Sequence, residues 1–206
     1  MIRINIAFRL PKDVETKAIN IAVNLAKNKE NYFFLDGITA LSHVKIYAPV
    51  VEENKVPEIL NTLEREVAKI EEVYLTVAKV SQNQGFVSIE FGLTPDIKKI
   101  QDEILTLIKD FRAENLSEEF LNGADYNMNH SEGSVQSLEK YGSVGIVNYH
   151  PHLTLFRLKN EIDAELAKRK VEWDTPRFKI SKIGVFVMGQ HGVCNELIEE
   201  FELKKL

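Results

Sequence analysis

The sequence predicts an α+β fold of two pseudo-symmetric β-α-β-α-β lobes, with antiparallel sheets around a central cleft. Three observations support this prediction. Stretches with apolar residues at every second position alternate along the chain with stretches of helical spacing. Two pairs of segments resemble each other within the chain. The length of 206 residues fits a single two-lobed domain over residues 1–206, with lobe one at about 1–80 and lobe two at about 85–206.

The expected first lobe starts with a strand over the first nine or ten residues, where isoleucines alternate with polar residues. Pro11 ends this strand and opens a helix over about 12–28, because its missing N–H is not needed in a first helical turn. A short strand is expected at about 41–48. Pro57 then opens a second amphipathic helix, which extends to about residue 70.

The expected second lobe has more elements and one insertion. Thr94 is a good N-cap residue for its first helix, with proline at the next position. The elements are expected in this order: strands at about 72–80 and 85–92, a helix from 95 to about 111, an irregular insertion at about 113–148 with a short helix near 134–140, a strand at about 150–158, a helix at about 160–169, a strand at about 178–187 that is bulged near 181–184, and a last strand that ends near 203.

Two segments of the first lobe recur in the second. Residues 8–10 match residues 91–93 at an offset of 83 positions, and residues 43–47 match residues 152–156 at an offset of 109. The difference of 26 positions is about the size of the irregular insertion, so the lobes are equivalent, with extra chain inserted into the second.

The repeated histidines form the candidate site. A His-x-[Ser/Thr] pattern arises by chance for about one histidine in ten, so His152 and Thr154 alone fit an ordinary strand equally well. Their match to His43 and Lys45 changes this, because equivalent strands of a pseudo-two-fold arrangement can face each other across a cleft. Period-two geometry places His43 with Lys45, and His152 with Thr154, on one face of each strand, so the four side chains are expected to converge.

This combination of side chains has a chemical meaning. Cleavage of a phosphodiester needs a base for the attacking oxygen and an acid for the leaving oxygen, and two histidines with an unperturbed pKa of about 6.5 can share these tasks. Lysine and threonine can bind the non-bridging phosphate oxygens. The design needs no metal or other cofactor, and the sequence has no His-Glu-x-x-His motif, no cysteine pair and no carboxylate beside either histidine in its strand.

These motifs resemble the 2H phosphoesterase superfamily, which includes 2′-5′ RNA ligase-like proteins and RNA 2′,3′-cyclic phosphodiesterases. The resemblance rests on the paired motifs at 43–46 and 152–155, the opening at 6–11, the flanks at 151–157 and the closing strand pair at 178–203. It implies that His43 and His152 are the acid–base pair and that Thr154 binds phosphate. Arg157 matches a trailing arginine of the family, which would contact substrate, but its strand parity points away from His152 unless a bulge intervenes.

Lys45 departs from the family pattern, which has Ser or Thr at this position. In an active interpretation, the ammonium anchors phosphate more strongly than a hydroxyl and lowers the pKa of His43, which favours neutral His43 as the base and His152 as the acid. In a degenerate interpretation, the hydroxyl is lost, Lys45 crowds the cleft, and the protein only binds phosphates or is inactive.

Other residues near the motifs have two interpretations each. Tyr47 and Phe156 follow the motifs on the same expected face, where they either stack a base of the substrate or belong to the core or rim. His150 lines the rim of the cleft or is a surface histidine, and His191 belongs to a glycine-flanked turn. The insertion at about 113–148 is either a lid or binding loop or a surface excursion.

Composition and charge narrow the setting and the partners. The net charge of −5 argues against coating of long nucleic acid. The single Cys194 and the lack of a long apolar run predict a cytoplasmic protein without a membrane partner. We expect a monomer that acts on a small phosphoester or an RNA end. The predicted activity is metal-independent phosphodiester chemistry on a 2′,3′-cyclic phosphate or 2′-5′-linked ribonucleotide end. The alternatives are non-catalytic binding of a nucleotide or RNA end, and a 2H enzyme for another phosphoester.

Overall fold

The computed structural model describes residues 1–113, 137, 140–143 and 145–205. Its strands are β1 (Ile2–Phe8), β2 (Asn31–Phe34), β3 (Val44–Tyr47), β4 (Val50–Val51), β5 (Val73–Asn83), β6 (Phe86–Phe91), β7 (His152–Leu158), β8 (Arg177–Ile180), β9 (Lys182–Met188) and β10 (Cys194–Glu202). Its helices are α1 (Lys12–Ala26), α2 (Val56–Val67), α3 (Pro95–Ile108) and α6 (Glu161–Lys168), with short 3₁₀ turns η1 (Glu53–Lys55), η2 (Lys109–Phe111) and η3 (Gln190–Gly192).

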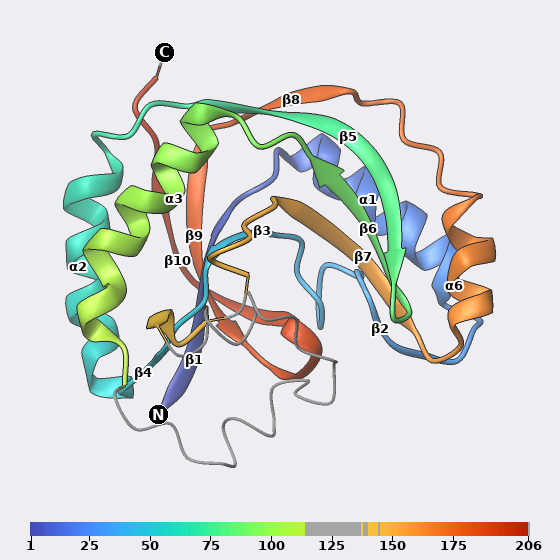
Figure 1. Cartoon of the computed structure of the whole chain (residues 1–206), viewed down its shortest axis with the longest axis horizontal. Helices are drawn as coiled ribbons and strands as arrows, with labels where there is room; N and C mark the ends of the chain where they lie inside the picture. Colours follow the sequence, from blue (N-terminus) through green and yellow to red (C-terminus); the bar gives the residue numbers. More distant parts are fainter. Residues whose placement is uncertain (114–136, 138–139, 144, 206) are drawn as a thin grey trace.

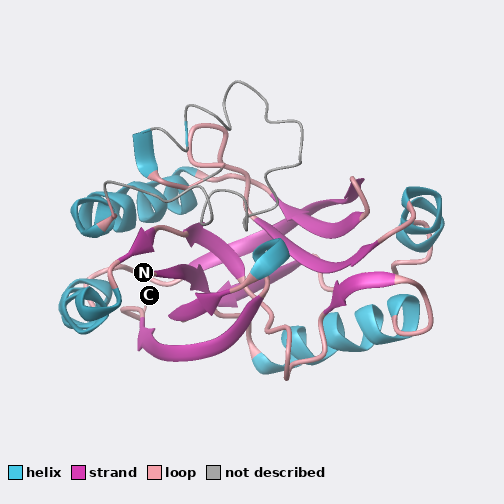
Figure 2. Cartoon of the chain, turned by 90° about the horizontal axis from the view of Figure 1, so that it is seen from below, coloured by secondary structure: helices cyan, strands magenta, loops and turns pink. Residues whose placement is uncertain are grey.

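The strands form two antiparallel sheets, as the sequence predicts, and each sheet is covered by two helices (Figure 1, Figure 2). The first sheet has the order β10-β9-β1-β3, with β4 also paired to β1, and it packs against α2 and α3. The second sheet has the order β2-β7-β6-β5-β8 and packs against α1 and α6. Strands β3 and β7, which follow or contain the two candidate histidines, contact each other where the sheets meet.

Sheet membership does not follow the expected lobe ranges of about 1–80 and 85–206. The first sheet takes β9 and β10 from the end of the chain, and the second sheet takes β2 and β5 from the first eighty or so residues. The expected bulged strand at about 178–187 is wrong, because it is two strands that belong to different sheets. Strand β8 pairs with β5 and β9 pairs with β1, so the chain crosses between the sheets at Ser181.

The helices begin close to the residues that the sequence marks as helix starts. Pro11 directly precedes α1, and Pro57 lies in the first turn of α2. Thr94 caps α3, because its hydroxyl accepts a hydrogen bond from the Ile97 backbone N–H at 3.3 Å. The expected short helix near 134–140 lies mainly outside the described residues, of which Ser137 and Lys140 are helical. None of the helices described is both long and apolar enough to cross a membrane.

The strands next to the site share an irregularity that the sequence analysis left open. In β3, one extra residue, Ile46, follows Lys45 in the pairing with β1. In β7, one extra residue, Leu155, follows Thr154 in the pairing with β6. Both are β-bulges at the same place in the repeated motif, and a bulge of this kind exchanges the faces of the residues that follow it. The correspondence between the two repeated motifs therefore extends to the bulges.

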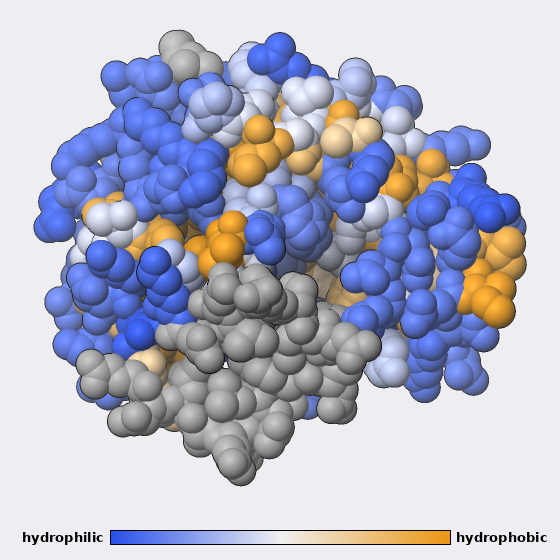
Figure 3. All heavy atoms as spheres, in the orientation of Figure 1, coloured by the Kyte–Doolittle hydropathy of each residue, from blue (hydrophilic) through white to orange (hydrophobic). Residues whose placement is uncertain are grey.

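The described part of the face shown in Figure 3 is mostly hydrophilic. A small apolar patch lies over α6, where Ile162 and Leu166 are exposed. Most buried apolar residues of both sheets and of the four helices named above belong to one continuous hydrophobic cluster, and Ala7, Phe186 and Cys194 form a second, smaller one. The two sheets therefore form a single packed unit, which fixes β3 and β7 relative to each other.

Candidate active site

The two motif histidines are held in the same way. His43 directly precedes β3 and His152 is the first residue of β7, and both are half-buried. In each ring, Nδ1 is hydrogen-bonded to the backbone carbonyl two residues earlier, at 3.0 Å from Leu41 O and at 3.1 Å from His150 O. A carbonyl oxygen only accepts, so Nδ1 carries the hydrogen. In the neutral ring Nε2 is then the nitrogen that accepts a proton.

Lys45 lies within electrostatic reach of both rings. Burial lowers the pKa of His43 and of His152 to about 4, and the charge of Lys45 contributes to both shifts. Burial also lowers the pKa of Lys45 to about 8, with a further contribution from Arg3. The sequence-based expectation that Lys45 singles out His43 is therefore replaced by a shared effect, in which one ammonium disfavours protonation of both imidazoles.

The backbone around Lys45 is held by the segment that precedes β7. The Tyr149 hydroxyl donates a hydrogen bond to the Lys45 carbonyl at 2.9 Å. Gly145 has a positive φ of 71°, and a Cβ atom at this position would lie 3.4 Å from the Lys45 Nζ. The described end of the insertion, residues 145–149, thus packs against the lysine of the first motif.

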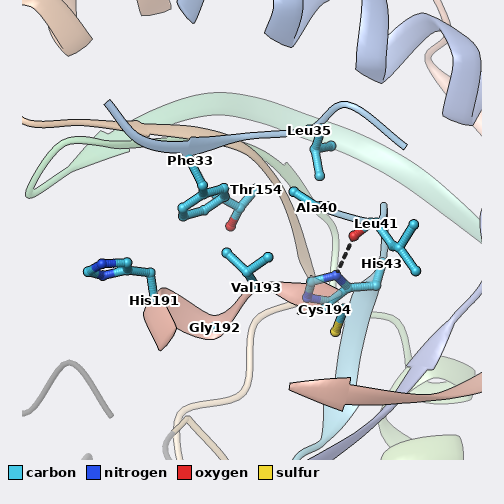
Figure 4. A pocket seen from close by; sticks show the side chains of 10 residues that line it. All are labelled: Phe33, Leu35, Ala40, Leu41, His43, Thr154, His191, Gly192, Val193 and Cys194. Carbon is cyan, nitrogen blue, oxygen red and sulfur yellow. Dashed lines mark hydrogen bonds between the residues drawn. The ribbon is translucent and has the colours of Figure 1, made fainter. Parts of the chain in front are cut away.

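Thr154 shares a small pocket with His43, and its hydroxyl accepts a hydrogen bond from the Ser88 hydroxyl at 3.2 Å. In Figure 4, Thr154 lies between His43 and His191, which come from opposite sides of the pocket. The walls are largely apolar. The lining residues are Phe33, Leu35, Ala40, Leu41, His43, Thr154, His191, Gly192, Val193 and Cys194. A polar hydroxyl and an imidazole in an apolar pocket are typical of a site that orients a ligand with few polar contacts.

The bulges decide which of the later residues reach the cleft. Tyr47 and Phe156 are fully buried in the core, so of their two interpretations the core placement holds and the stacking of a substrate base does not. The Tyr47 hydroxyl instead donates to the Tyr141 carbonyl at 2.8 Å. The bulge in β7 turns Arg157 to the face of His152 and Thr154, because one regularly paired residue, Phe156, and the extra residue, Leu155, lie between Thr154 and Arg157.

Two histidines that the sequence analysis weighed as surface and turn residues contact this site. His150 stacks on His152, with ring centroids 5.0 Å apart and an interplanar angle of 23°. His191 lines the pocket, and its Nδ1 is 2.7 Å from Nη1 of Arg157. The sequence places His150 on the motif face by parity, but nothing local to His191 indicates its contact with a residue 34 positions earlier.

Around the site, the described side chains include no cluster suited to hold a metal ion. No group of three or more His, Cys, Asp or Glu side chains suited to hold a metal occurs among the residues that the structure describes. Cys194 is buried, and burial raises its pKa to about 12. Its thiol accepts a hydrogen bond from Asn5 Nδ2 at 3.2 Å, which fits a structural role.

Comparisons with known proteins identify a family that the sequence matches and solved structures of similar fold. A model of the 2′-5′ RNA ligase superfamily matches residues 41–192, which include both histidine motifs. The fold is similar to that of LigT from E. coli complexed with 3′-AMP, with a TM-score of 0.60, 10% sequence identity, and coverage of 98% of this chain and 97% of that chain. It is also similar to TT0787 from Thermus thermophilus, with a TM-score of 0.55, 13% identity, and coverage of 98% of each chain. A search of curated proteins finds no match to the sequence.

Proposed function

The chain belongs to the 2′-5′ RNA ligase superfamily, and on that basis we propose that it is a metal-independent phosphodiesterase that acts on 2′,3′-cyclic phosphate or 2′-5′-linked ribonucleotide or RNA ends. The single observation that carries this proposal is the matched anchoring of His43 and His152. Each Nδ1 is fixed by a backbone carbonyl, so that each Nε2 serves as the proton-transfer atom.

The proposed reaction is a displacement at phosphorus. Water attacks the phosphorus of a 2′,3′-cyclic phosphate, and Nε2 of one histidine takes its proton. The bond from phosphorus to one ribose oxygen breaks, and the second histidine donates a proton to that oxygen. The product is a ribose phosphomonoester, and in the reverse of the same steps the ribose hydroxyl attacks phosphorus and water leaves, which closes the cyclic phosphate again.

Lys45 and Thr154 would hold the non-bridging oxygens of the reacting phosphate. With pKa values near 4, both imidazoles of the free protein are neutral at pH 7, whereas Lys45, with a pKa of about 8, is mostly charged. An anionic phosphate beside the rings favours the protonated imidazole, because opposite charges stabilise each other in a site of low dielectric. Substrate binding would therefore supply the conditions under which one histidine becomes the acid.

A second candidate function is binding of a nucleotide or RNA end without turnover. The observation in its favour is Lys45 itself, which stands where the superfamily pattern has a hydroxyl residue. Binding needs only the cation and the hydroxyl, whereas turnover needs both histidines to exchange protons with the substrate.

The test is hydrolysis of the four 2′,3′-cyclic mononucleotides in the presence of EDTA, by the wild-type protein and by His152→Ala. We expect turnover that persists in EDTA and falls by about 10²–10⁴-fold in His152→Ala. The released isomer, a 2′- or 3′-monophosphate, identifies the leaving oxygen. Binding by calorimetry without turnover would favour the second candidate, and loss of activity in EDTA that added metal restores would overturn the metal-independent mechanism.

A further inference from the structure

The rings of the two motif histidines are anchored alike, but the backbones that carry them are held differently. His152 belongs to β7 and pairs with Glu90 of β6 in the sheet. Ser42 and His43 lie between an isolated bridge at Leu41 and the first residue of β3, and the pairing of β3 with β1 does not include them. The position of His43 therefore depends more strongly on contacts outside the sheet.

Glu15 makes such a contact with the residue next to His43. The Ser42 hydroxyl donates a hydrogen bond to Oε1 of Glu15 at 2.7 Å, and both side chains are buried. A hydrogen bond to a charged acceptor is among the strong ones in a protein, and burial strengthens it further. Because Glu15 lies in the first turn of α1, this bond ties the backbone before β3 to the start of a helix.

Arg9 connects Glu15 to the surroundings of the His43 ring. Its Nη1 lies 3.6 Å from the same Oε1 of Glu15, and its Nε lies 3.4 Å from Glu200. The pairing of β1 with β3, continued by one step past its last pair, brings Arg9 opposite His43. The Arg9 Cζ and the His43 ring centre lie 5.6 Å and 6.0 Å from the centre of the Phe186 ring. A cation thus lies near the first motif ring, with Glu15 as one of its counter-ions.

The charge of Arg9 distinguishes the first histidine from the second. Burial lowers the pKa of His43 to about 4, and the charges of Lys45 and Arg9 add to this shift. The charges that add to the corresponding shift of His152 are those of Lys45 and of the neighbouring histidines. The other titratable groups near the His43 ring come from three further elements. They are His152 of β7, His191 of η3 and Cys194 of β10.

We propose that Glu15 is a positioning residue for the first motif, which fixes His43 through Ser42 and balances the charge of Arg9 beside the ring. The catalytic consequence of this inference rests on the proposed function, because Glu15 acts through other residues and not on the reacting atoms. His152 is held by its place in the sheet, so α1 supplies to the first motif what the β6–β7 pairing supplies to the second.

The first measurement follows the two motif rings by NMR in the free protein. The ¹⁵N shifts of an imidazole show which nitrogen carries the hydrogen, and His43→Ala and His152→Ala assign the signals. In the wild type both rings should carry the hydrogen on Nδ1, because each Nδ1 faces a carbonyl. In Ser42→Ala the His43 ring should populate both tautomers, while the His152 ring keeps its wild-type signals.

The second measurement is hydrolysis of a 2′,3′-cyclic mononucleotide. Ser42→Ala should lower kcat about tenfold, the effect of one hydrogen bond to a charged group that orients a proton-transfer residue. KM should change little, because Lys45 and Thr154 are left intact. Ser42→Thr keeps the hydroxyl and should restore most of kcat together with the single tautomer of His43.

Glu15→Gln separates the hydrogen bond from the charge. Its amide oxygen can replace Oε1 for Ser42, and its NH₂ group then takes the place of Oε2, which faces the exposed side chain of Lys12 at 3.1 Å. The tautomer of His43 should therefore be kept. The Arg9 charge is less balanced, so the midpoint of the His43 titration should move to lower pH, and Arg9→Gln should move it to higher pH.

Glu72→Gln is the matched control for the loss of a buried carboxylate. Glu72 is also buried and pairs with Lys179 at 2.9 Å, but it does not line the pocket of His43. This variant should leave kcat, the tautomer and the titration of His43 as in the wild type.

His43 signals in Ser42→Ala that match the wild type would overturn the proposed role of the hydrogen bond. Equal changes at His43 and His152 would overturn it as well, since they would show a general loosening of the fold. An unchanged His43 midpoint in Glu15→Gln would overturn the charge balance, and this variant decides the question if Ser42→Ala does not fold. If the wild type hydrolyses no cyclic nucleotide, the proposed catalytic function fails, while the ring signals still decide whether Glu15 positions His43.

Discussion

The two histidine strands share the way in which the histidine is held and the position of the bulge, and they differ in the side chain of the third motif residue. Both anchor the ring by Nδ1 to the carbonyl two residues earlier, and both bulge directly after the third motif residue. They differ at that third residue, which is Lys45 at β3 and Thr154 at β7. The repeat therefore presents two equivalently held histidines, and under the proposed function phosphate binding is divided between a cation and a hydroxyl.

The surroundings of the two strands widen this difference. On the β7 side, Ser88 donates to Thr154, and His150 stacks on His152. On the β3 side, His43 lies 6.0 Å from the Phe186 ring, and Lys45 is held through its carbonyl by Tyr149. Polar support is thus concentrated on β7, and the removal of equivalent residues from the two strands should have unequal effects.

The largest effect should come from the two motif histidines, which are held in the same way in both strands. His43→Ala and His152→Ala should each lower kcat/KM for a cyclic nucleotide by about 10²–10⁴-fold, since each removes one proton-transfer group. The double variant should be about as slow as the slower single variant, because the acid and the base act as a unit and neither accelerates the reaction fully without the other. Steady-state kinetics in EDTA provide the measurement, with thermal unfolding as the control for folding. Full multiplication of the two effects would show that the histidines act independently.

The next effect should come from Lys45, where the strands differ. Lys45→Met removes the charge at similar length and should lower kcat/KM at pH 7 by about 10²-fold, the usual cost of one donor to a developing phosphate charge. Lys45→Thr makes the motifs alike and should cost less, because a hydroxyl still donates. An increase in activity in Lys45→Thr would instead support the degenerate interpretation of the first motif.

The pH profile of kcat/KM provides a second test of the role of the Lys45 charge. Lys45 is charged below its pKa of about 8 and neutral above it, so phosphate affinity should fall as the pH rises through about 8. In Lys45→Thr this alkaline decline should disappear. Because the Lys45 charge lowers the pKa of both His43 and His152, the acid limb near pH 4 should also move to higher pH. A profile that keeps its alkaline limb in Lys45→Thr would assign that limb to another group.

Thr154 and Ser88 give a smaller effect on the other strand. The Ser88 hydroxyl donates to Thr154, which leaves the Thr154 hydrogen directed to another acceptor such as a phosphate oxygen. Thr154→Val should lower kcat/KM by about tenfold, and Ser88→Ala by a few-fold. Thr154→Ser keeps the hydroxyl and serves as the control. If Thr154→Val and Thr154→Ser lose the same activity, the hydroxyl is not the group that matters.

The helices and the histidine pair could be predicted because their signals are local or repeated. Pro11 and Thr94 mark helix starts by their own backbone chemistry, and the match of residues 43–47 to 152–156 identifies both histidines at once. The sheet to which a strand belongs could not be predicted. Residues 178–187 read as one strand, yet β8 and β9 pair with strands about a hundred residues or more earlier, which depends on the tertiary fold.

The bulges explain why the cleft-facing residues were predicted only in part. Strict alternation places Tyr47 and Phe156 beside the histidines and turns Arg157 away, but the structure reverses both assignments. One signal was present, since alternation would turn an arginine toward the core and two aromatic residues toward a polar cleft, a conflict that one extra residue resolves. The contact between Arg157 and His191 joins distant parts of the chain and has no local signal.

The smallest expected effect concerns His150, which has no counterpart on β3. Its ring packs on His152 at 5.0 Å, and its charge contributes to the lowered pKa of His152. His150→Ala removes both and should lower kcat/KM by about two- to tenfold, the range for one aromatic contact. His150→Phe keeps the stacked ring without the charge, so it should restore most of this loss. Because a positive neighbour is gone, the acid limb of the His150→Phe profile should lie at higher pH than in the wild type.

The equivalent position before the first motif provides the control for this comparison. Leu41 stands two residues before His43 and supplies only its carbonyl to the histidine, so Leu41→Ala should leave the acid limb in place. Activity assays of the three variants from pH 4 to 9 would separate ring packing from charge. Full activity in both His150→Ala and His150→Phe, with no shift of the acid limb, would mean that His150 supports β7 through its backbone carbonyl alone, and the two strands would then be held by the same means.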